Sequence, residues 1–456
     1  MKNIFKKISI IGTVTLAAMT FGSCEFDEVI DPNAPSLGGV QENATIGQLN
    51  ELVSGILSSS RFGLGVETTA SGTMARELYL FDADPRNTGD LLGKNGIGLD
   101  NNSFYSVSQW NGNYRAIKNT NILLNAIDNT ESINDAERNG YAGFAKTIQA
   151  YELIQILKSY GMARTDVADE FNLGPVLGFD EAISNIRTLL DDAQTDLNNA
   201  GSSFLFDITG FEIEPGPPTI EATPQSFLPF NRGVAGMAAV YAGDGNGALT
   251  ALAESSLNLS ATTLEDLNAG PKHLFSQQAN DQTNPVFRGP STPENPNNGD
   301  QIIVHPSFIA DATPGDARVE RKTALRPDPS TQDELTGDFE TRLYATNVSP
   351  IDILRNEELI LLYAEASILA GSPGDAVTAL NVVRNVSGNI GDYTGPTTTD
   401  ALTEELLRQR RYSLWSENHR MFDLRRYNMS DMLPIDRAGD QIFNVFDIPL
   451  SENTGA

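Results

Sequence analysis

The feature that most constrains the fold is a predicted helical hairpin between residues 353 and 383. Apolar side chains recur at helical spacing from Leu359 to Leu369, and Gly371 follows at the position where positive φ ends a helix. Residues 372–375 (SPGD) then supply an N-cap serine, a proline at the first helical position and an acid three residues after the cap. Because only Gly371 and Ser372 remain for the turn, the two helices must pack antiparallel.

An internal repeat relates this hairpin to an earlier segment. Residues 242–252 (AGDGNGALTAL) align without gaps to residues 370–380 (AGSPGDAVTAL), with six identical positions. Chance identity in an alanine-rich window is the alternative, but both copies fall at the turn of a predicted helix pair. Repeated helix-turn-helix units with an alanine-rich inner face are typical of tetratricopeptide-like stacking. Further helical stripes are predicted over residues 46–56, 110–127, 144–157, 183–197 and 400–416.

Three segments interrupt the helical pattern: residues 79–109, 202–229 and 260–350. They are rich in Gly, Pro, Asn and Asp, and only Gln301–His305 is predicted as a short strand. Long irregular segments within a compact domain are usually functional. We therefore expect a mainly α-helical protein with one domain over residues 46–456. Tetratricopeptide-like helical hairpins would form its scaffold, and the loop-rich segments would bind a ligand.

The N-terminus has the pattern of a lipoprotein signal peptide. Residues 1–23 combine a lysine-rich start, an apolar run over residues 8–21 and two small residues, and the only cysteine, Cys24, follows directly. The alternative is a buried helix with a chance cysteine. We predict a signal peptide over residues 1–23, acylation of Cys24, and a flexible tether over residues 24–45. Acyl chains would hold the protein firmly at a membrane.

The charge of the chain limits its partners. The formal net charge is −29, and removal of the lysine-rich leader would take it to about −32. Such a protein is repelled by nucleic acid, which excludes that class of ligand. The charge also argues against a polyanionic ligand. An anionic ligand would require Arg76, Arg86, Arg288 and Arg318 to cluster.

Two strings near the C-terminus resemble the closing part of the SusD/RagB family. They are residues 363–384 (YAEASILAGSPGDAVTALNVVR) and residues 402–427 (LTEELLRQRRYSLWSENHRMFDLRRY). Gln409 stands where the family often has Glu and Asn418 where it often has Gly, and neither change breaks the helical pattern. The spacing of Trp110, Tyr114, Ile117 and Asn121 and the ending over residues 446–452 are similar to the family too.

This resemblance implies a function and a location. Members of the family are nutrient-binding lipoproteins of the outer membrane in Bacteroidetes-type bacteria. The chain would be anchored there through Cys24 and face the cell exterior, and acids at positions 25, 27 and 28 resemble the family's surface-export tag. It would capture oligosaccharides or polysaccharides and, as a lid, pass them to a SusC-type TonB-dependent transporter. The alternatives are a peptide-capturing lid of the RagB type and a structural helical-repeat adaptor with no small ligand.

No pattern of catalytic or metal-binding residues stands out. His273 and His305 are isolated, and His419 lies in the family-like tail, where we expect a hydrogen-bonded packing residue. No hydrolase, zinc-protease or nucleotide-binding motif occurs, so we expect neither catalytic residues nor a cofactor. Calcium could use the acidic stretches at residues 166–170 and 311–316, but neither has EF-hand spacing.

The ligand-binding candidates come from the loop-rich segments. A sugar ring needs a flat aromatic face, and its hydroxyls need amide or charged groups. The first segment supplies aromatic residues beside amides and an arginine, and the third supplies further aromatics. Core packing is the alternative for each aromatic residue, and Trp110 shares a helical stripe with Tyr114 and Ile117. The predicted ligand-binding residues are Arg86, Asn101, Asn102, Tyr105, Trp110, Phe287 and Tyr344.

Overall fold

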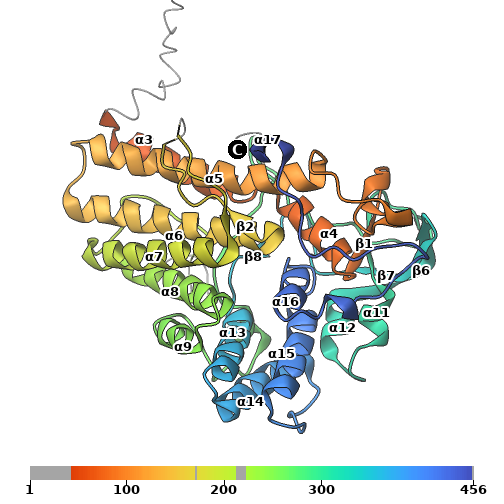
Figure 1. Cartoon of the computed structure of the whole chain (residues 1–456). Helices are drawn as coiled ribbons and strands as arrows, with labels where there is room; N and C mark the ends of the chain where they lie inside the picture. Colours follow the sequence, from red (N-terminus) through yellow and green to blue (C-terminus); the bar gives the residue numbers. More distant parts are fainter. Residues whose placement is uncertain (1–42, 170–171, 212–221, 454–456) are drawn as a thin grey trace, which may run out of the picture.

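The computed structural model describes residues 43–169, 172–211 and 222–453 (Figure 1). The predicted signal peptide, Cys24 and most of the predicted tether lie outside these residues and stay predictions. Within the described ranges, no helix combines the length and the apolar character that crossing a membrane requires.

A stack of antiparallel helices forms the scaffold. Each helix packs against the next one in the series α3, α5, α6, α7, α8, α9, α13 and α14, which runs down one side of the molecule (Figure 1). This confirms the predicted mainly α-helical, tetratricopeptide-like fold. The bounds are α3 Ile46–Ser59, α5 Phe104–Asn129, α6 Asp135–Tyr160, α7 Phe179–Asn199, α8 Pro224–Tyr241, α9 Gly245–Ala253, α13 Asn356–Leu369 and α14 Pro373–Val382.

The two copies of the internal repeat adopt the same turn. Gly243 follows α8 and Gly371 follows α13, and both have a φ of 74°, the left-handed conformation that favours glycine. Asp244 then caps α9 by accepting a hydrogen bond from the backbone of Gly247 at 2.8 Å. The two hairpins are in contact, since a Cβ on Gly245 would lie 2.7 Å from the carbonyl oxygen of Ala366. The predicted repeat is confirmed.

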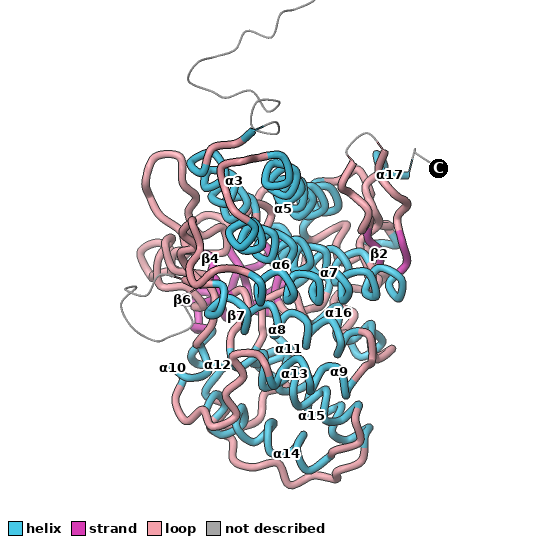
Figure 2. Tube along the Cα trace, turned by 90° about the vertical axis from the view of Figure 1, so that its left-hand side faces the viewer, coloured by secondary structure: helices cyan, strands magenta, loops and turns pink. Residues whose placement is uncertain are grey.

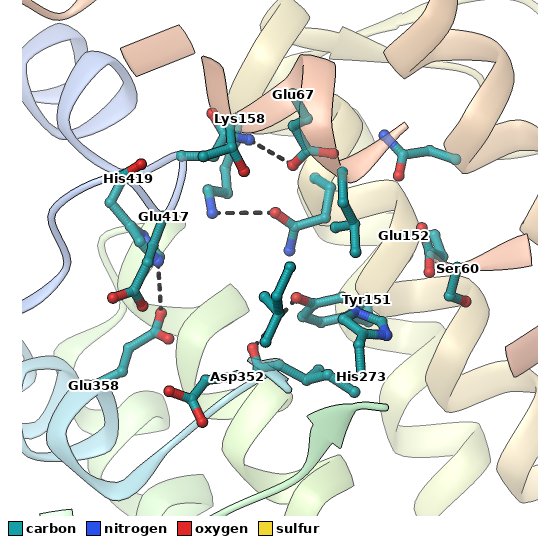
Figure 3. Close-up of a pocket in the computed structure, with 18 of the residues that line it drawn as sticks. Ser60, Glu67, Tyr151, Glu152, Lys158, His273, Asp352, Glu358, Glu417 and His419 are labelled. Carbon is teal, nitrogen blue, oxygen red and sulfur yellow. Dashed lines mark hydrogen bonds and ion pairs between the residues drawn. The ribbon is translucent and has the colours of Figure 1, made fainter. Parts of the chain in front are cut away.

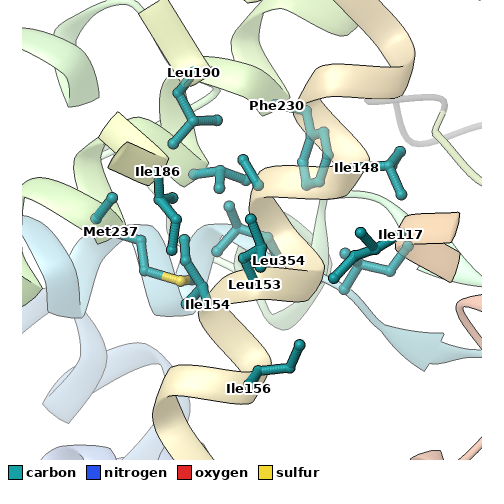
Figure 4. Close-up of a cluster of buried hydrophobic side chains, with 14 of the residues drawn as sticks. Ile117, Ile148, Leu153, Ile154, Ile156, Ile186, Leu190, Phe230, Met237 and Leu354 are labelled. Carbon is teal, nitrogen blue, oxygen red and sulfur yellow. The ribbon is translucent and has the colours of Figure 1, made fainter. Parts of the chain in front are cut away.

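The main hydrophobic core lies around α6, which is buried on nearly all sides. Figure 4 shows side chains of α6 meeting those of α7 and α8 there. Burying one such aliphatic side chain stabilises the fold by about 1.5–3 kcal/mol, so this cluster fixes the stacking of the helices. The labelled members include Ile148, Leu153, Ile154, Ile156, Ile186, Leu190, Phe230 and Met237.

A four-stranded antiparallel sheet has the strand order β1-β5-β7-β6. The predicted strand at Gln301–His305 is confirmed as β5, Gln301–Val304. The other three strands were not predicted: β1 (Leu78–Phe81), β6 (Thr323–Gln332) and β7 (Leu335–Thr341). Two prolines lie in β6, at positions 327 and 329, and are tolerated because β6 is an edge strand with a register shift beside them.

The remaining elements are short. Figure 2 shows β4, β6 and β7 to one side of the stacked helices. Two small ladders pair β2 (Met162–Ala163) with β3 (Leu177–Gly178) and β4 (Lys272–His273) with β8 (Ile351–Asp352). The other helices are α4 (Leu64–Met74), α10 (Leu264–Asn268), α11 (Pro306–Ala310), α12 (Ala317–Lys322), α15 (Thr399–Ser413), α16 (Arg420–Arg426) and α17 (Leu450–Asn453). The tighter 3₁₀ turns are η1 (Pro85–Asn87), η2 (Lys94–Gly96) and η4 (Ser430–Met432), and η3 (Val383–Gly388) is a wider π-helical turn.

Two of the predicted irregular segments end earlier than expected. Helix α5 begins at Phe104, so the first segment ends at residue 103 instead of residue 109. Helix α8 begins at Pro224 and includes Pro229. Thr223 caps this helix by accepting a hydrogen bond from the backbone of Ser226, and proline is well suited to the first helical position. The prolines at 224 and 229 were therefore misread as loop residues.

Candidate ligand-binding site

An arginine stacked on a phenylalanine marks the segment before α5. The Arg86 guanidinium lies 4.7 Å from the centre of the Phe104 ring. Its orientation is fixed by two bonds to the Asp84 carboxylate, at 2.6 and 2.9 Å, and by a longer bond to the Ser103 hydroxyl at 3.3 Å. The arginine side chain remains 45% exposed. This pair thus offers a guanidinium and part of an aromatic ring to solvent.

Two asparagines precede Phe104 in the chain. Asn102 is exposed, and its backbone donates to the Asp100 carboxylate at 2.8 Å. Asn101 is half-buried, and its carbonyl accepts a hydrogen bond from the backbone of Leu450 at 3.2 Å. Neither side-chain amide has a hydrogen-bond partner among the described residues, so both are free to bind the hydroxyls of a ligand.

Two predicted stacking rings lie in the interior instead. Tyr105 is fully buried; its hydroxyl donates to Asp90 at 3.0 Å and accepts from the backbone of Asp100 at 2.8 Å. Burial raises the pKa of Tyr105 to about 12. Trp110 is 2% exposed and packs edge-to-face on Tyr160 at 5.0 Å. Because neither ring presents a face to solvent, we correct their assignment from ligand contact to core packing.

The structure separates the other two predicted aromatics from this group. Phe287 is half-buried in the loop before β5, where its backbone carbonyl accepts a bond from Arg288 at 2.9 Å. Tyr344 is half-buried, packs near the sheet and lines an internal cavity. No contact joins either residue to the Arg86–Phe104 stack in the described part of the chain. Their role in binding a ligand stays a prediction.

The internal cavity lies between the helical stack and the C-terminal segments (Figure 3). Its volume of about 50 Å³ leaves room for a few water molecules and excludes a sugar ring. Its charged and polar walls come from α4, α5, α6, β4, β8, α13 and the segment before α16. They include Glu67, Asn113, Glu152, Lys158, His273, Asp352, Glu358, Glu417, Asn418 and His419.

Burial favours the neutral forms of several of these groups. It raises the pKa of Glu152 to about 8 and that of Glu358 to about 7, and it lowers the pKa of Lys158. His419 contacts Glu358 at 3.5 Å and Arg410 at 3.2 Å, and burial lowers its pKa. The prediction of a hydrogen-bonded packing role for His419 is confirmed. The cavity was not predicted from the sequence. Its charged residues are far apart in the chain, and each one is a single interruption in an otherwise apolar helical stripe.

A wider cleft of about 580 Å³ opens beside α16. Aromatic side chains form much of its wall, and Arg426 stacks over the Tyr241 ring at 4.7 Å. The polar groups there bind one another. Arg426 pairs with Glu365 at 2.6 Å and with Asp423 at 3.0 Å, and the Tyr427 hydroxyl also donates to Glu365, at 2.7 Å. The cleft therefore presents apolar surface and few free polar groups.

The second acidic stretch considered for calcium is engaged elsewhere, and Glu170 of the first stretch lies outside the described residues. Asp311 pairs with Arg411 at 2.8 Å, and Asp316 pairs with Arg318 at 2.6 Å. In the ranges that the structure covers, no group of three or more His, Cys, Asp or Glu residues is arranged to hold a metal ion.

Comparisons with known proteins agree on the fold. Residues 333–452 match the SusD family, and a search of curated protein sequences gave no match. Surface glycan-binding protein A from Bacteroides thetaiotaomicron has a similar structure, with a TM-score of 0.69 and 14% identity over 90% of this chain and 97% of that chain. The structure of its complex with laminarihexaose has a TM-score of 0.64 and 14% identity over 85% of this chain and 91% of that chain. A SusD superfamily protein from Bacteroides vulgatus has a TM-score of 0.66 and 16% identity over 90% of this chain and 96% of that chain. At such identities the structures establish a shared fold.

Proposed function

We propose that this chain, of which residues 333–452 match the SusD family, is a cell-surface lipoprotein that binds a glycan without transforming it. It would be anchored in the outer membrane through Cys24, face the cell exterior, and pass its ligand as a lid to a SusC-type TonB-dependent transporter. The structurally similar surface glycan-binding protein A, known in complex with laminarihexaose, supports a glycan as the ligand.

The Arg86–Phe104 stack is the observation that supports this proposal most directly. A half-buried aromatic ring, a fixed guanidinium and the free amides of Asn101 and Asn102 are the kinds of group that a pyranose ring and its hydroxyls require. None of these groups is arranged as a nucleophile beside a general base, the pairing that covalent catalysis needs. The proposed activity is therefore capture alone.

The ligand is proposed to be neutral. Arg76 and Arg318 are fully buried, and their carboxylate partners are Asp436 at 3.5 Å and Asp316 at 2.6 Å. These cations consequently do not join Arg86 to form a surface for a polyanion. The overall charge of −29 then repels an anionic polymer.

Calorimetric titration tests the proposal. The mature chain with Cys24→Ser would be titrated with neutral gluco-oligosaccharides, uronate oligosaccharides and a peptide digest. We expect heat with a neutral oligosaccharide, and at least about tenfold weaker binding for Arg86→Ala and Phe104→Ala, which is about 1.4 kcal/mol. Arg408→Ala, on the exposed face of α15, is the control and should bind normally. Heat from peptides alone would replace the proposal by a peptide-capturing lid. If none of the three kinds of ligand produces heat, the result would favour a structural adaptor.

A further inference from the structure

Phe62 has the most exposed aromatic side chain in the part of the chain that the structure describes. It lies in the turn between α3 and α4, and 49% of it is exposed. Small-molecule sites are lined mainly by apolar and aromatic side chains, so an exposed ring held in a fixed position is a candidate for ligand contact.

The turn that carries Phe62 is fixed tightly to α5. A Cβ on Gly112 would lie 2.4 Å from the carbonyl oxygen of Phe62, so glycine is required for the backbones to approach this closely. Gly63 continues the turn with a φ of 96° and lies against the backbone of Ser108. The ring therefore stands in a preformed position, which reduces the entropy lost when a ligand binds.

Arg115 lies over this ring. Its guanidinium is 5.1 Å from the ring centre, and the residue is exposed. Across the described ranges it makes no hydrogen bond and no ion pair, although acidic residues outnumber basic ones in this chain by 60 to 31. By contrast, Arg86 is bound by Asp84 and Arg426 by two carboxylates. Arg115 thus has all its N–H donors available to a ligand.

The two Phe–Arg stacks lie along one face of α5. Phe104 and Arg115 are eleven residues apart in this helix, which is close to three full turns and about 16 Å along the axis. Asn111 lies on the same face between them and is exposed. Figure 1 shows α5 running along one edge of the molecule, where a long ligand has access to this face.

We propose that Phe62 and Arg115 form a second glycan contact, so that one extended oligosaccharide lies along α5 from the Arg86–Phe104 stack to the Phe62–Arg115 stack. This inference rests on the proposed function and adds a location and a minimum length for the ligand. A sugar ring would stack on Phe62, and the side chains of Arg115 and Asn111 would bind its hydroxyls. A span of about 16 Å exceeds the length of a disaccharide, so longer oligosaccharides must bind more tightly.

A length series of ligands separates this inference from the proposed function. The mature chain with Cys24→Ser would be titrated with neutral gluco-oligosaccharides, β-1,3- and α-1,4-linked, from the disaccharide to the hexasaccharide. We expect the hexasaccharide of the preferred linkage to bind about tenfold more tightly than the disaccharide. Phe62→Ala and Arg115→Ala should remove this gain and leave the disaccharide affinity unchanged, whereas Phe62→Tyr should keep the gain.

Matched controls exclude a general effect on the fold. Leu325→Ala removes an apolar side chain that is 67% exposed on β6, and Arg408→Ala removes an exposed arginine on α15. Both should keep the full gain with length, and all variants should match the far-UV circular dichroism of the parent. If Phe62→Ala and Arg115→Ala also keep the gain, the second contact is wrong while the proposed function stands. If the parent chain binds no oligosaccharide, both are wrong.

Discussion

The same side-chain pairing occurs in two regions of this protein with different surroundings. Beside α16, Arg426 lies over the Tyr241 ring at 4.7 Å, and on α5, Arg115 lies over Phe62 at 5.1 Å. Arg426 is also held by the carboxylates of Glu365 and Asp423, whereas Arg115 has no such partner within the described residues. The comparison indicates that stacking alone does not define a role. A neutralised interior arginine joins helices, and a free one on the surface is available to a ligand.

The largest expected effect is the loss of a carboxylate from the interior region. Asp423 is buried and contacts Arg410 at 2.6 Å and Arg426 at 3.0 Å. Asp423→Ala leaves two buried guanidinium groups short of a partner, so the free energy of unfolding should fall by about 3–5 kcal/mol. Urea unfolding, followed by circular dichroism, measures this loss.

Asp311→Ala is the matched control for this change. Asp311 contacts Arg411 at 2.8 Å, a similar distance, but its side chain is 55% exposed. Removing an exposed ion pair of this kind should cost only about 0–1 kcal/mol. Equal losses for Asp423→Ala and Asp311→Ala would show that burial does not distinguish the two regions.

The second effect depends on pH and concerns the internal cavity. Burial raises the pKa of Glu152 to about 8 from an ordinary value of 4.5. The folded state therefore holds this proton more tightly than the unfolded state. The contribution of protonated Glu152 to the free energy of unfolding is fully present below pH 4.5 and is lost as the pH rises through 8. One pKa unit corresponds to about 1.4 kcal/mol, so the loss is on the order of a few kcal/mol.

Glu152→Gln should reduce this pH dependence. The variant should gain stability relative to the parent at pH 9 and differ little from it at pH 5, as measured by urea unfolding at both values. Glu358, with a pKa of about 7, titrates over the same range and should leave part of the slope in place. Glu404→Gln, at an exposed position of α15, should leave the slope unchanged. If the stability of the parent chain rises from pH 5 to pH 9, burial of Glu152 does not control the pH dependence.

Helices and turns with local signals could be predicted from the sequence, and contacts between distant segments could not. The α13–α14 hairpin was predicted because glycine and proline at its turn restrict the backbone directly. The β6–β7 hairpin was missed because Asp333 and Glu334 form its turn, with φ of 52° and 66°, at positions usually taken by Asn-Gly or Asp-Gly.

The candidate site shows the same limit. The segment that carries Arg86, Asn101 and Asn102 was identified from its composition, because polar and aromatic residues in a loop indicate ligand contact. Whether a ring of α5 faces solvent depends on what packs against the helix. Trp110 faces Tyr160 of α6 and is buried. The spacing of apolar residues along α5 does not indicate this contact. Phe62 and Arg115 were missed because they meet only when the α3–α4 turn packs on α5.

A smaller effect concerns the close backbone contact that positions Phe62. Gly112→Ala would place a Cβ 2.4 Å from the carbonyl oxygen of Phe62, and the turn would have to move away from α5. Such overpacking should lower the free energy of unfolding by about 1–3 kcal/mol and weaken the binding of long oligosaccharides. Gly55→Ala in α3 is the control, because a Cβ there meets nothing within 4 Å. It should stabilise the protein by about 0.5–1 kcal/mol. A Gly112→Ala variant as stable as the parent would show that this turn is free to shift.

The smallest expected effect on stability is that of Arg115→Ala, and it separates the two regions most sharply. Arg115 is exposed, lies over the Phe62 ring and makes no hydrogen bond or ion pair within the residues described, so its removal should change the free energy of unfolding by no more than about 0.5–1 kcal/mol. Arg426→Ala, its counterpart in the interior, should cost about 3–5 kcal/mol because Glu365 and Asp423 lose a buried partner. Urea unfolding of both variants measures the difference. If Arg115→Ala destabilises the protein as much as Arg426→Ala, then Arg115 is part of the scaffold and its free guanidinium is not reserved for a ligand.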